Sequence, residues 1–120
     1  PYQNDLFLYQ SYVDTVVDYV HELQGNPRYE NYSFMVVGHS LGGGLANIVG
    51  ARTNIPSFGS EPPGNMYSRL KFNIDYQSIV NTASSNVRRY DPVTLVDKQL
   101  GQVQYLSCPT SYYDAYCHSQ

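Results

Sequence analysis

The feature that most constrains the fold is a short apolar run that ends at a serine between glycines. Val36-Val37 is followed by Gly38-His39-Ser40-Leu41-Gly42, a Gly-x-Ser-x-Gly pattern. Apolar residues then return at helical spacing, at Leu45, Ile48 and Val49. This order predicts a fully buried parallel strand over residues 33–38 and a helix over residues 41–52, joined by a sharp turn. Glycine is expected on both sides of the turn because a side chain there would collide with the neighbouring strand or helix.

The turn also gives the serine a possible chemical role. Such a turn lifts the Ser40 hydroxyl out of the sheet and directs the first backbone amides of the helix toward the same space. A negatively charged oxygen would form in this space during acyl transfer. We therefore interpret Ser40 as a candidate nucleophile and the amide of Leu41 as a candidate oxyanion donor. The alternative interpretation is a glycine-rich turn that only connects a strand to a helix.

The rest of the chain alternates between helical and strand patterns. An amphipathic helix is predicted over residues 5–23, capped by Asn4 or Asp5 and ended by Gly25 with Pro27. Its apolar face consists of Leu6, Tyr9, Val13, Val16, Val17, Val20 and Leu23. Further predicted elements are strands over residues 54–59, 78–82 and 103–106, a Pro-Pro-Gly loop over residues 60–65 and a short helix over residues 66–72. The pattern indicates an α/β fold with a mainly parallel sheet, in one domain over residues 1–120.

Composition excludes several classes of function. The chain of 120 residues has a net charge of −3 and scattered basic residues, so it lacks the basic stripe of a nucleic-acid-binding protein. No apolar run reaches the length of a membrane span, and no signal peptide opens the sequence. Because the first residue is Pro1, we expect a processed product or an excised fragment. No motif indicates a metal or a cofactor.

Two short features bear on the cellular compartment. The two cysteines, Cys108 and Cys117, lie near the C-terminal end and could close a small loop. A disulfide would suit a secreted or vacuolar protein, whereas two reduced thiols would suit a cytoplasmic one. Asn31-Tyr32-Ser33 is an N-glycosylation acceptor sequence and agrees with secretion. We therefore expect a secreted or vacuolar/lysosomal protein, with a cytoplasmic location as the alternative.

Several segments taken together resemble the class 3 (fungal-type) lipases of the α/β-hydrolase superfamily. These segments are Gly38-His39-Ser40-Leu41-Gly42-Gly43 with Leu45-Ala46, then Ser57-Phe58-Gly59, Asp91-Pro92-Val93 and a histidine near the end of the chain. The likeness covers roughly residue 33 to the C-terminus. Cys117-His118-Ser119 and the Asp-Pro-Val step look most similar to the vacuolar and lysosomal phospholipase-like branch. The resemblance implies a partial α/β-hydrolase fold, a lipid ester substrate and transient contact with a membrane or lipid surface.

The resemblance also implies a catalytic triad. Matched by position, Ser40 is the nucleophile, Asp91 the acid and His118 the base. Their order along the chain is the order that the α/β-hydrolase topology requires. Asp97 is the rival acid, and Asp91 is favoured because apolar residues that follow it can pack behind it at a strand end. Those apolar residues are Val93, Leu95 and Val96.

The three histidines have different expected environments. His21 lies on the predicted amphipathic helix beside Glu22 and is expected to be solvated. The ring of His39 is expected to point away from Ser40 into the body of the fold. His118 lies two residues from the end of the sequence, where fraying would leave a side chain loose. A disulfide between Cys108 and Cys117 would hold it in place.

Departures from the family pattern leave other functions open. Members usually have proline where Thr94 stands and alanine where Gly44 stands, and their sheets have further strands before the serine turn. The loop that carries a second oxyanion donor and the lid are also expected to be missing. The alternative to a lipase or phospholipase is therefore a non-catalytic or truncated module with an incomplete oxyanion hole, and a third class is a serine peptidase or acyltransferase. The loop over residues 60–65 either helps to wall an acyl-chain groove or is a rigid connector.

Overall fold

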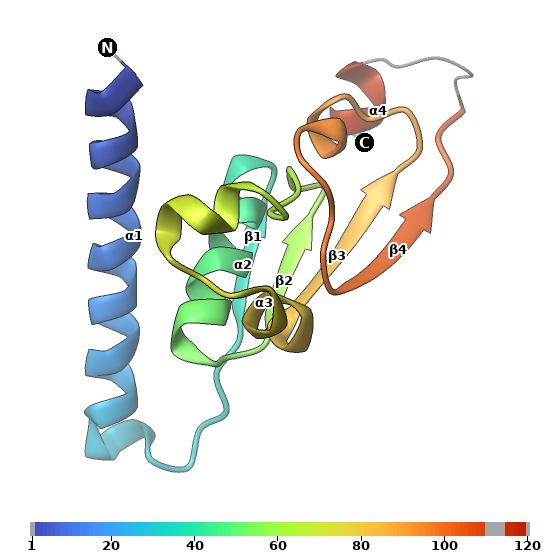
Figure 1. The fold of residues 1–120 in the computed structure, drawn as a ribbon. Helices are drawn as coiled ribbons and strands as arrows, with labels where there is room; N and C mark the ends of the chain where they lie inside the picture. The colour runs from blue at the N-terminus through green and yellow to red at the C-terminus, as the bar shows by residue number, and fades with distance from the viewer. Residues whose placement is uncertain (1, 110–114, 120) are drawn as a thin grey trace.

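A computed structural model describes the backbone of residues 2–109 and 115–119, and the side chains of residues 12–109 and 115–119. This part of the chain forms a sheet flanked by helices (Figure 1). The strands are β1 (Val36–His39), β2 (Ser57–Ser60), β3 (Ala83–Arg88) and β4 (Gln102–Leu106). The helices are α1 (Tyr2–Gly25), α2 (Leu41–Thr53), α3 (Tyr76–Thr82) and α4 (Ala115–Ser119), with short 3-10 helices η1 (Pro27–Tyr29), η2 (Ser68–Phe72) and η3 (Val93–Leu95).

The sheet is parallel throughout, in the order β1-β2-β3-β4. Val36 pairs with Ser57, and Ser57 in turn pairs with Ala83. Because all strands run in one direction, their carboxyl ends meet at one edge, and α4 lies beyond this edge (Figure 1). The α/β class and the parallel sheet predicted from the sequence are confirmed.

The core forms where α2 packs against the sheet and against α1 and α3. It includes Val13 and Val17 of α1, Ile48 and Val49 of α2, and Ile79 of α3, all buried. Burial of each such side chain stabilises the fold by about 1.5–3 kcal/mol.

A buried polar group also ties α2 to the sheet. The Asn47 side chain donates to Ser85 Oγ at 3.1 Å and accepts from Ser57 Oγ at 2.8 Å. Since Ser57 lies on β2 and Ser85 on β3, these two bonds satisfy polar groups that would be costly to bury alone.

Helix α1 is longer than predicted. It begins at Tyr2, so Asn4 and Asp5 lie inside the helix and do not cap it, and it ends at Gly25 as expected. The buried Val13 and Val17 lie on the predicted apolar face, whereas the side chains of Leu6 and Tyr9 lie outside the described residues. No helix among the described residues combines the length and the apolar character that crossing a membrane requires.

The strand predicted over residues 78–82 is wrong, because these residues belong to α3. Asp75 caps this helix by accepting the N–H of Ser78 at 2.9 Å, and Ile79 is buried against the core. The strand follows directly as β3, whose inward residues include Ser85. Because the buried Ser85 is polar, the sequence of β3 lacks the alternation of apolar and polar residues by which a strand is recognised.

Strand β1 differs from the fully buried strand expected over residues 33–38. It begins only at Val36 and lies at the edge of the described sheet, where it pairs with β2. Val37 is 66% exposed, because α2 covers only the opposite face of β1. β2 and β4 correspond to predicted strands, with β2 starting at Ser57.

Candidate active site

The turn between β1 and α2 holds Ser40 in a strained conformation. Its φ is +56°, a region that residues other than glycine rarely adopt. The Ser40 N–H donates to the carbonyl of Ser60 at 2.9 Å, and the Ser40 carbonyl accepts the N–H groups of Gly43 and Gly44 at 2.9 and 3.2 Å. The predicted sharp turn is therefore formed, and Leu41 is the first residue of the helix that follows it. Strain of this kind persists where surrounding bonds hold it and is common at functional sites.

The glycines around Ser40 are not equally necessary. A Cβ at Gly38 would overlap the carbonyl of Gly42, which confirms the expectation at this position. Gly42 faces open space, so the expected collision there is wrong. The close contact lies one residue later, because a Cβ at Gly43 would approach the Gly38 carbonyl oxygen to 3.0 Å and Gly59 Cα to 3.2 Å. A Cβ at Gly44 would lie 3.0 Å from Pro63, which explains the absence of alanine there.

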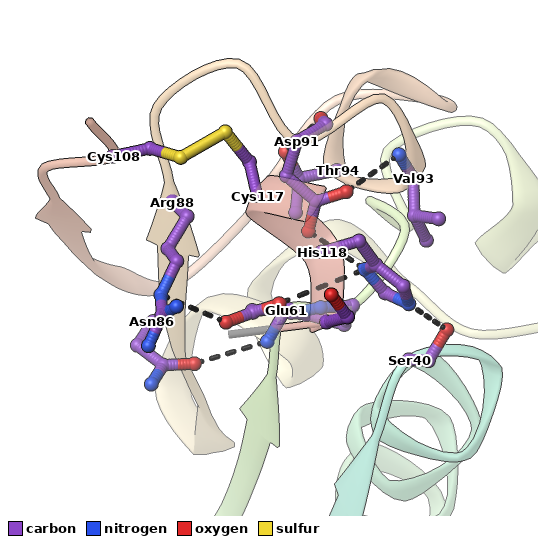
Figure 2. Close-up of polar contacts among 12 residues, drawn as sticks. Ser40, Glu61, Asn86, Arg88, Asp91, Val93, Thr94, Cys108, Cys117 and His118 are labelled. Atoms are coloured by element: carbon purple, nitrogen blue, oxygen red, sulfur yellow. Dashed lines mark hydrogen bonds and ion pairs between the residues drawn. A yellow bond between two sulfur atoms is a disulfide. The ribbon is translucent and has the colours of Figure 1, made fainter. Parts of the chain in front are cut away.

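Three side chains from distant parts of the chain meet at the carboxyl edge of the sheet (Figure 2). His118 Nε2 lies 2.8 Å from Ser40 Oγ, and His118 Nδ1 lies 2.8 Å from Asp91 Oδ2. Ser40 follows β1, Asp91 follows β3, and His118 comes from α4. The structure thus brings the three predicted residues into one hydrogen-bonded chain, the arrangement in which a base activates a hydroxyl nucleophile.

Asp91 is held by the turn that it begins. Its carboxylate is fully buried, and Oδ1 accepts the N–H of Val93 at 2.9 Å. Thr94, at the position where the family usually has proline, donates its hydroxyl to the Asp91 carbonyl at 2.9 Å. The predicted apolar packing behind Asp91 is wrong for Leu95 and Val96, which are 56% and 61% exposed, whereas Val93 is half-buried. Local hydrogen bonds replace it.

The sequence pattern of the family described as Lipase (class 3) matches residues 5–67, a little over half of the chain. The chain belongs to the class 3 lipase family. The match begins earlier than the resemblance noted above, since it includes most of α1, and it ends before Asp91 and His118. No curated protein matches the chain. Placement in the vacuolar and lysosomal branch stays a prediction.

The rival acid has a different partner in this class 3 lipase. The Asp97 carboxylate accepts the backbone N–H groups of Tyr67 and Ser68 at 3.0 and 2.8 Å, together with that of Lys98 at 2.7 Å. Partial burial raises the pKa of Asp97, but these hydrogen bonds together lower the pKa further, so it lies below its usual value. Asp97 therefore fastens the loop after β2 to the loop after η3.

His39 is placed differently from our expectation. Its ring stacks on that of His118, with centroids 5.3 Å apart and an interplanar angle of 27°, and the residue is exposed. The reason is strand alternation: Val36 and Gly38 face α2, so His39 faces the other way. His21 is exposed, as predicted.

The expected disulfide between Cys108 and Cys117 is present in the lipase (Figure 2). It joins the segment after β4 to α4, and Cys117 is fully buried beside His118 in sequence. Helix α4 spans only five residues, too few to be stable alone. The disulfide therefore holds the helix that presents His118.

Removal of this disulfide should weaken both folding and hydrolysis. We expect the Cys108→Ser/Cys117→Ser variant to lose about 2–3 kcal/mol of unfolding free energy, from the loop that the bridge closes. Ester hydrolysis should fall by more than the unfolded fraction explains, because His118 is no longer held near Ser40. Urea unfolding and hydrolysis of a soluble ester measure the two effects. Full hydrolysis after reduction of the bridge, verified by mass spectrometry, would contradict this role.

Sequence reasoning missed one charged member of the site, Glu61. Its carboxylate is 3% exposed; Oε1 pairs with Arg88 Nε at 3.1 Å, and Oε2 lies 3.6 Å from His118 Nδ1 (Figure 2). Burial raises the pKa of Glu61, Arg88 lowers it in part, and Asp91 raises it again. One signal could have identified Glu61: a charged residue directly after a parallel strand lies at the edge where sites form.

Glu61, Asp91 and His118 place carboxylate and imidazole ligand atoms within 4.8 Å of one another, a donor set that could hold a metal ion. In this arrangement, however, Arg88 pairs with Glu61, and both ring nitrogens of His118 face hydrogen-bond partners. We therefore interpret the cluster as a proton relay.

A mainly apolar cavity of about 180 Å³ opens beside the serine turn of the lipase. Its wall includes Leu41, Leu45, Ile48, Pro63 and Phe72. The loop over residues 60–65 therefore contributes to a groove, one of its two expected roles. The same loop is also firmly packed, because Pro62 is fully buried between Gly43 of α2 and Gly59 of β2.

Proposed function

We propose that this chain hydrolyses carboxylic esters of lipids, with Ser40 as nucleophile, His118 as base and Asp91 as acid. The observation that carries the proposal is the continuous hydrogen-bonded chain from Ser40 Oγ through His118 to Asp91, in a member of a lipase family. The fully buried Asp91 and the strained Ser40 turn support it.

In the first half of the reaction, Ser40 Oγ attacks the ester carbonyl carbon while its proton passes to His118 Nε2. The Leu41 amide donates to the oxygen that becomes negative, and Asp91 stabilises the positive ring. The C–O bond to the alcohol then breaks, and the alcohol leaves with the proton from His118. Water repeats the sequence on the acyl-enzyme, which releases a fatty acid and restores Ser40.

The surroundings of Ser40 suit an acyl chain. The apolar cavity begins at Leu41, the residue after the nucleophile, and is large enough for part of an alkyl chain. Leu41 and Val96 line this cavity and are also exposed, so they would contact a lipid surface from which a chain enters. The ester of a triacylglycerol or of a phospholipid meets these requirements, and hydrolysis of each as mixed micelles separates the two.

A second candidate is a lipid-binding module with little turnover. The observation that favours it is the oxyanion hole: among the described residues, we identify a donor only at the start of α2. Loss of one donor from such a site typically costs about 10²–10³-fold in kcat.

A fluorophosphonate probe distinguishes the two candidates. We expect the folded protein to be labelled covalently at Ser40, and expect labelling to disappear in Ser40→Ala and to fall strongly in His118→Ala. The matched control is Ser33→Ala, an exposed serine before β1. Absence of labelling in protein that melts cooperatively would overturn the hydrolase and favour the module. A panel of peptide and acyl-acceptor substrates tests for a peptidase or an acyltransferase.

A further inference from the structure

We propose that Glu61 is a positioning residue of the relay, a second carboxylate that stabilises His118 while the ring is positively charged. This inference rests on the proposed function. It concerns a residue that lies outside the Ser40, His118 and Asp91 chain and acts through His118.

Several contacts hold Glu61 where it is. It follows the last residue of β2 and has a φ of +51°, a conformation that a side chain other than glycine adopts at a cost. Its N–H donates to Asn86 O at 2.9 Å and Asn86 Oδ1 at 3.0 Å, and Arg88 pairs with its carboxylate. Asn86 and Arg88 both lie on β3. The strained backbone and the β3 contacts together direct the carboxylate toward His118.

The two carboxylate oxygens of Glu61 have different surroundings. Oε1 faces Arg88, whereas Oε2 is buried without a hydrogen-bond partner and lies 3.6 Å from His118 Nδ1. An unpaired buried oxygen is unfavourable while the ring is neutral. When His118 accepts the serine proton, a positive charge appears beside that oxygen, so the interaction strengthens in the transition state. This difference between the two states is what would accelerate the reaction.

The charges around the ring agree with this role. Asp91 and Glu61 are negative and Arg88 is positive, so the cluster carries one excess negative charge when His118 is neutral. Protonation of the ring balances that charge. The groups that face Glu61 are Arg88 of β3, Asp91 after β3, His118 of α4 and His39 of β1. Burial raises the pKa of Glu61 above its usual value, and the positive charge of Arg88 offsets part of this rise by favouring the ionised form.

The test is Glu61→Gln, which keeps the size of the side chain and removes its charge. We expect the titration midpoint of the His118 ring, followed by proton NMR, to fall by about one pH unit, and kcat to fall about tenfold with little change in KM. The acid limb of the pH–rate profile should move to lower pH by a similar amount. Glu30→Gln, at an exposed glutamate after η1, is the matched control and should change none of these values.

A second variant covers the case in which Glu61→Gln fails to fold because Arg88 loses its partner. Glu61→Met/Arg88→Met removes both charges and keeps an apolar contact, a replacement that buried ion pairs often tolerate. The His118 midpoint should fall again but by less than in Glu61→Gln, because the positive charge of Arg88 is removed as well. An unchanged midpoint in a folded variant would overturn the role of Glu61, whereas failure of the wild-type protein to react with the fluorophosphonate probe would overturn the hydrolase itself.

Discussion

Replacement of Asp91 by asparagine should lower kcat for ester hydrolysis by about 10⁴-fold while the protein stays folded. Asparagine has the shape of aspartate, and its Oδ1 can still accept the Val93 N–H. Its amide, however, donates toward His118 Nδ1, which fixes the ring proton on Nε2. In that tautomer His118 cannot accept the proton of Ser40.

Asp97→Asn provides the matched control. Asp97 contacts backbone N–H groups of Tyr67, Ser68 and Lys98, away from His118, so its replacement should alter stability but leave kcat near the wild-type value. Steady-state kinetics with a soluble ester and urea unfolding of both variants make the comparison. A kcat near wild type in Asp91→Asn, or a loss of activity confined to Asp97→Asn, would mean that the acid is assigned to the wrong residue.

Much of this fold could be predicted because its signals are local. The Gly-x-Ser-x-Gly turn, the apolar face of α1 and the strand over residues 103–106 are each visible within a short window of sequence. The disulfide could be anticipated because the chain has only two cysteines. The prediction of a strand over residues 78–82 was wrong because Ile79 and Val80 suit a strand as well as a helix. The contacts that favour the helix are the Asp75 cap and the packing of α3 on α2.

The site was predictable only in part, because its geometry depends on neighbours from other strands. Ser40 is marked by a local motif, but it meets His118 across 78 positions of the chain. The stacking of His39 on His118 and the burial of Glu61 depend on α4 and β3, which no short window around either residue includes. The sequence therefore indicated the chemistry of the site, whereas the contact between Glu61 and His118 became visible only in three dimensions.

A large loss of stability should come from Gly38→Ala. A methyl group at this position would overlap the backbone carbonyl of Gly42 and crowd the N–H of Gly43 at 2.8 Å, so β1 and α2 would have to separate. Backbone atoms joined into a strand and a helix cannot move aside as a flexible side chain can. We expect a loss of more than about 4 kcal/mol of unfolding free energy, beyond the range of most single substitutions, and no reaction with the fluorophosphonate probe.

Gly42→Ala is the matched control for this prediction, because it adds the same methyl group to the other glycine of the motif. Gly42 faces open space inside the first turn of α2, where alanine is favoured over glycine by up to about 1 kcal/mol. This variant should therefore be as stable as the wild-type protein or slightly more stable, and it should still be labelled at Ser40. Urea unfolding of the two variants separates a steric need for glycine from a requirement for the motif as a whole. Equal destabilisation at both positions would contradict the steric explanation, because only Gly38 lies against the backbone of the neighbouring element.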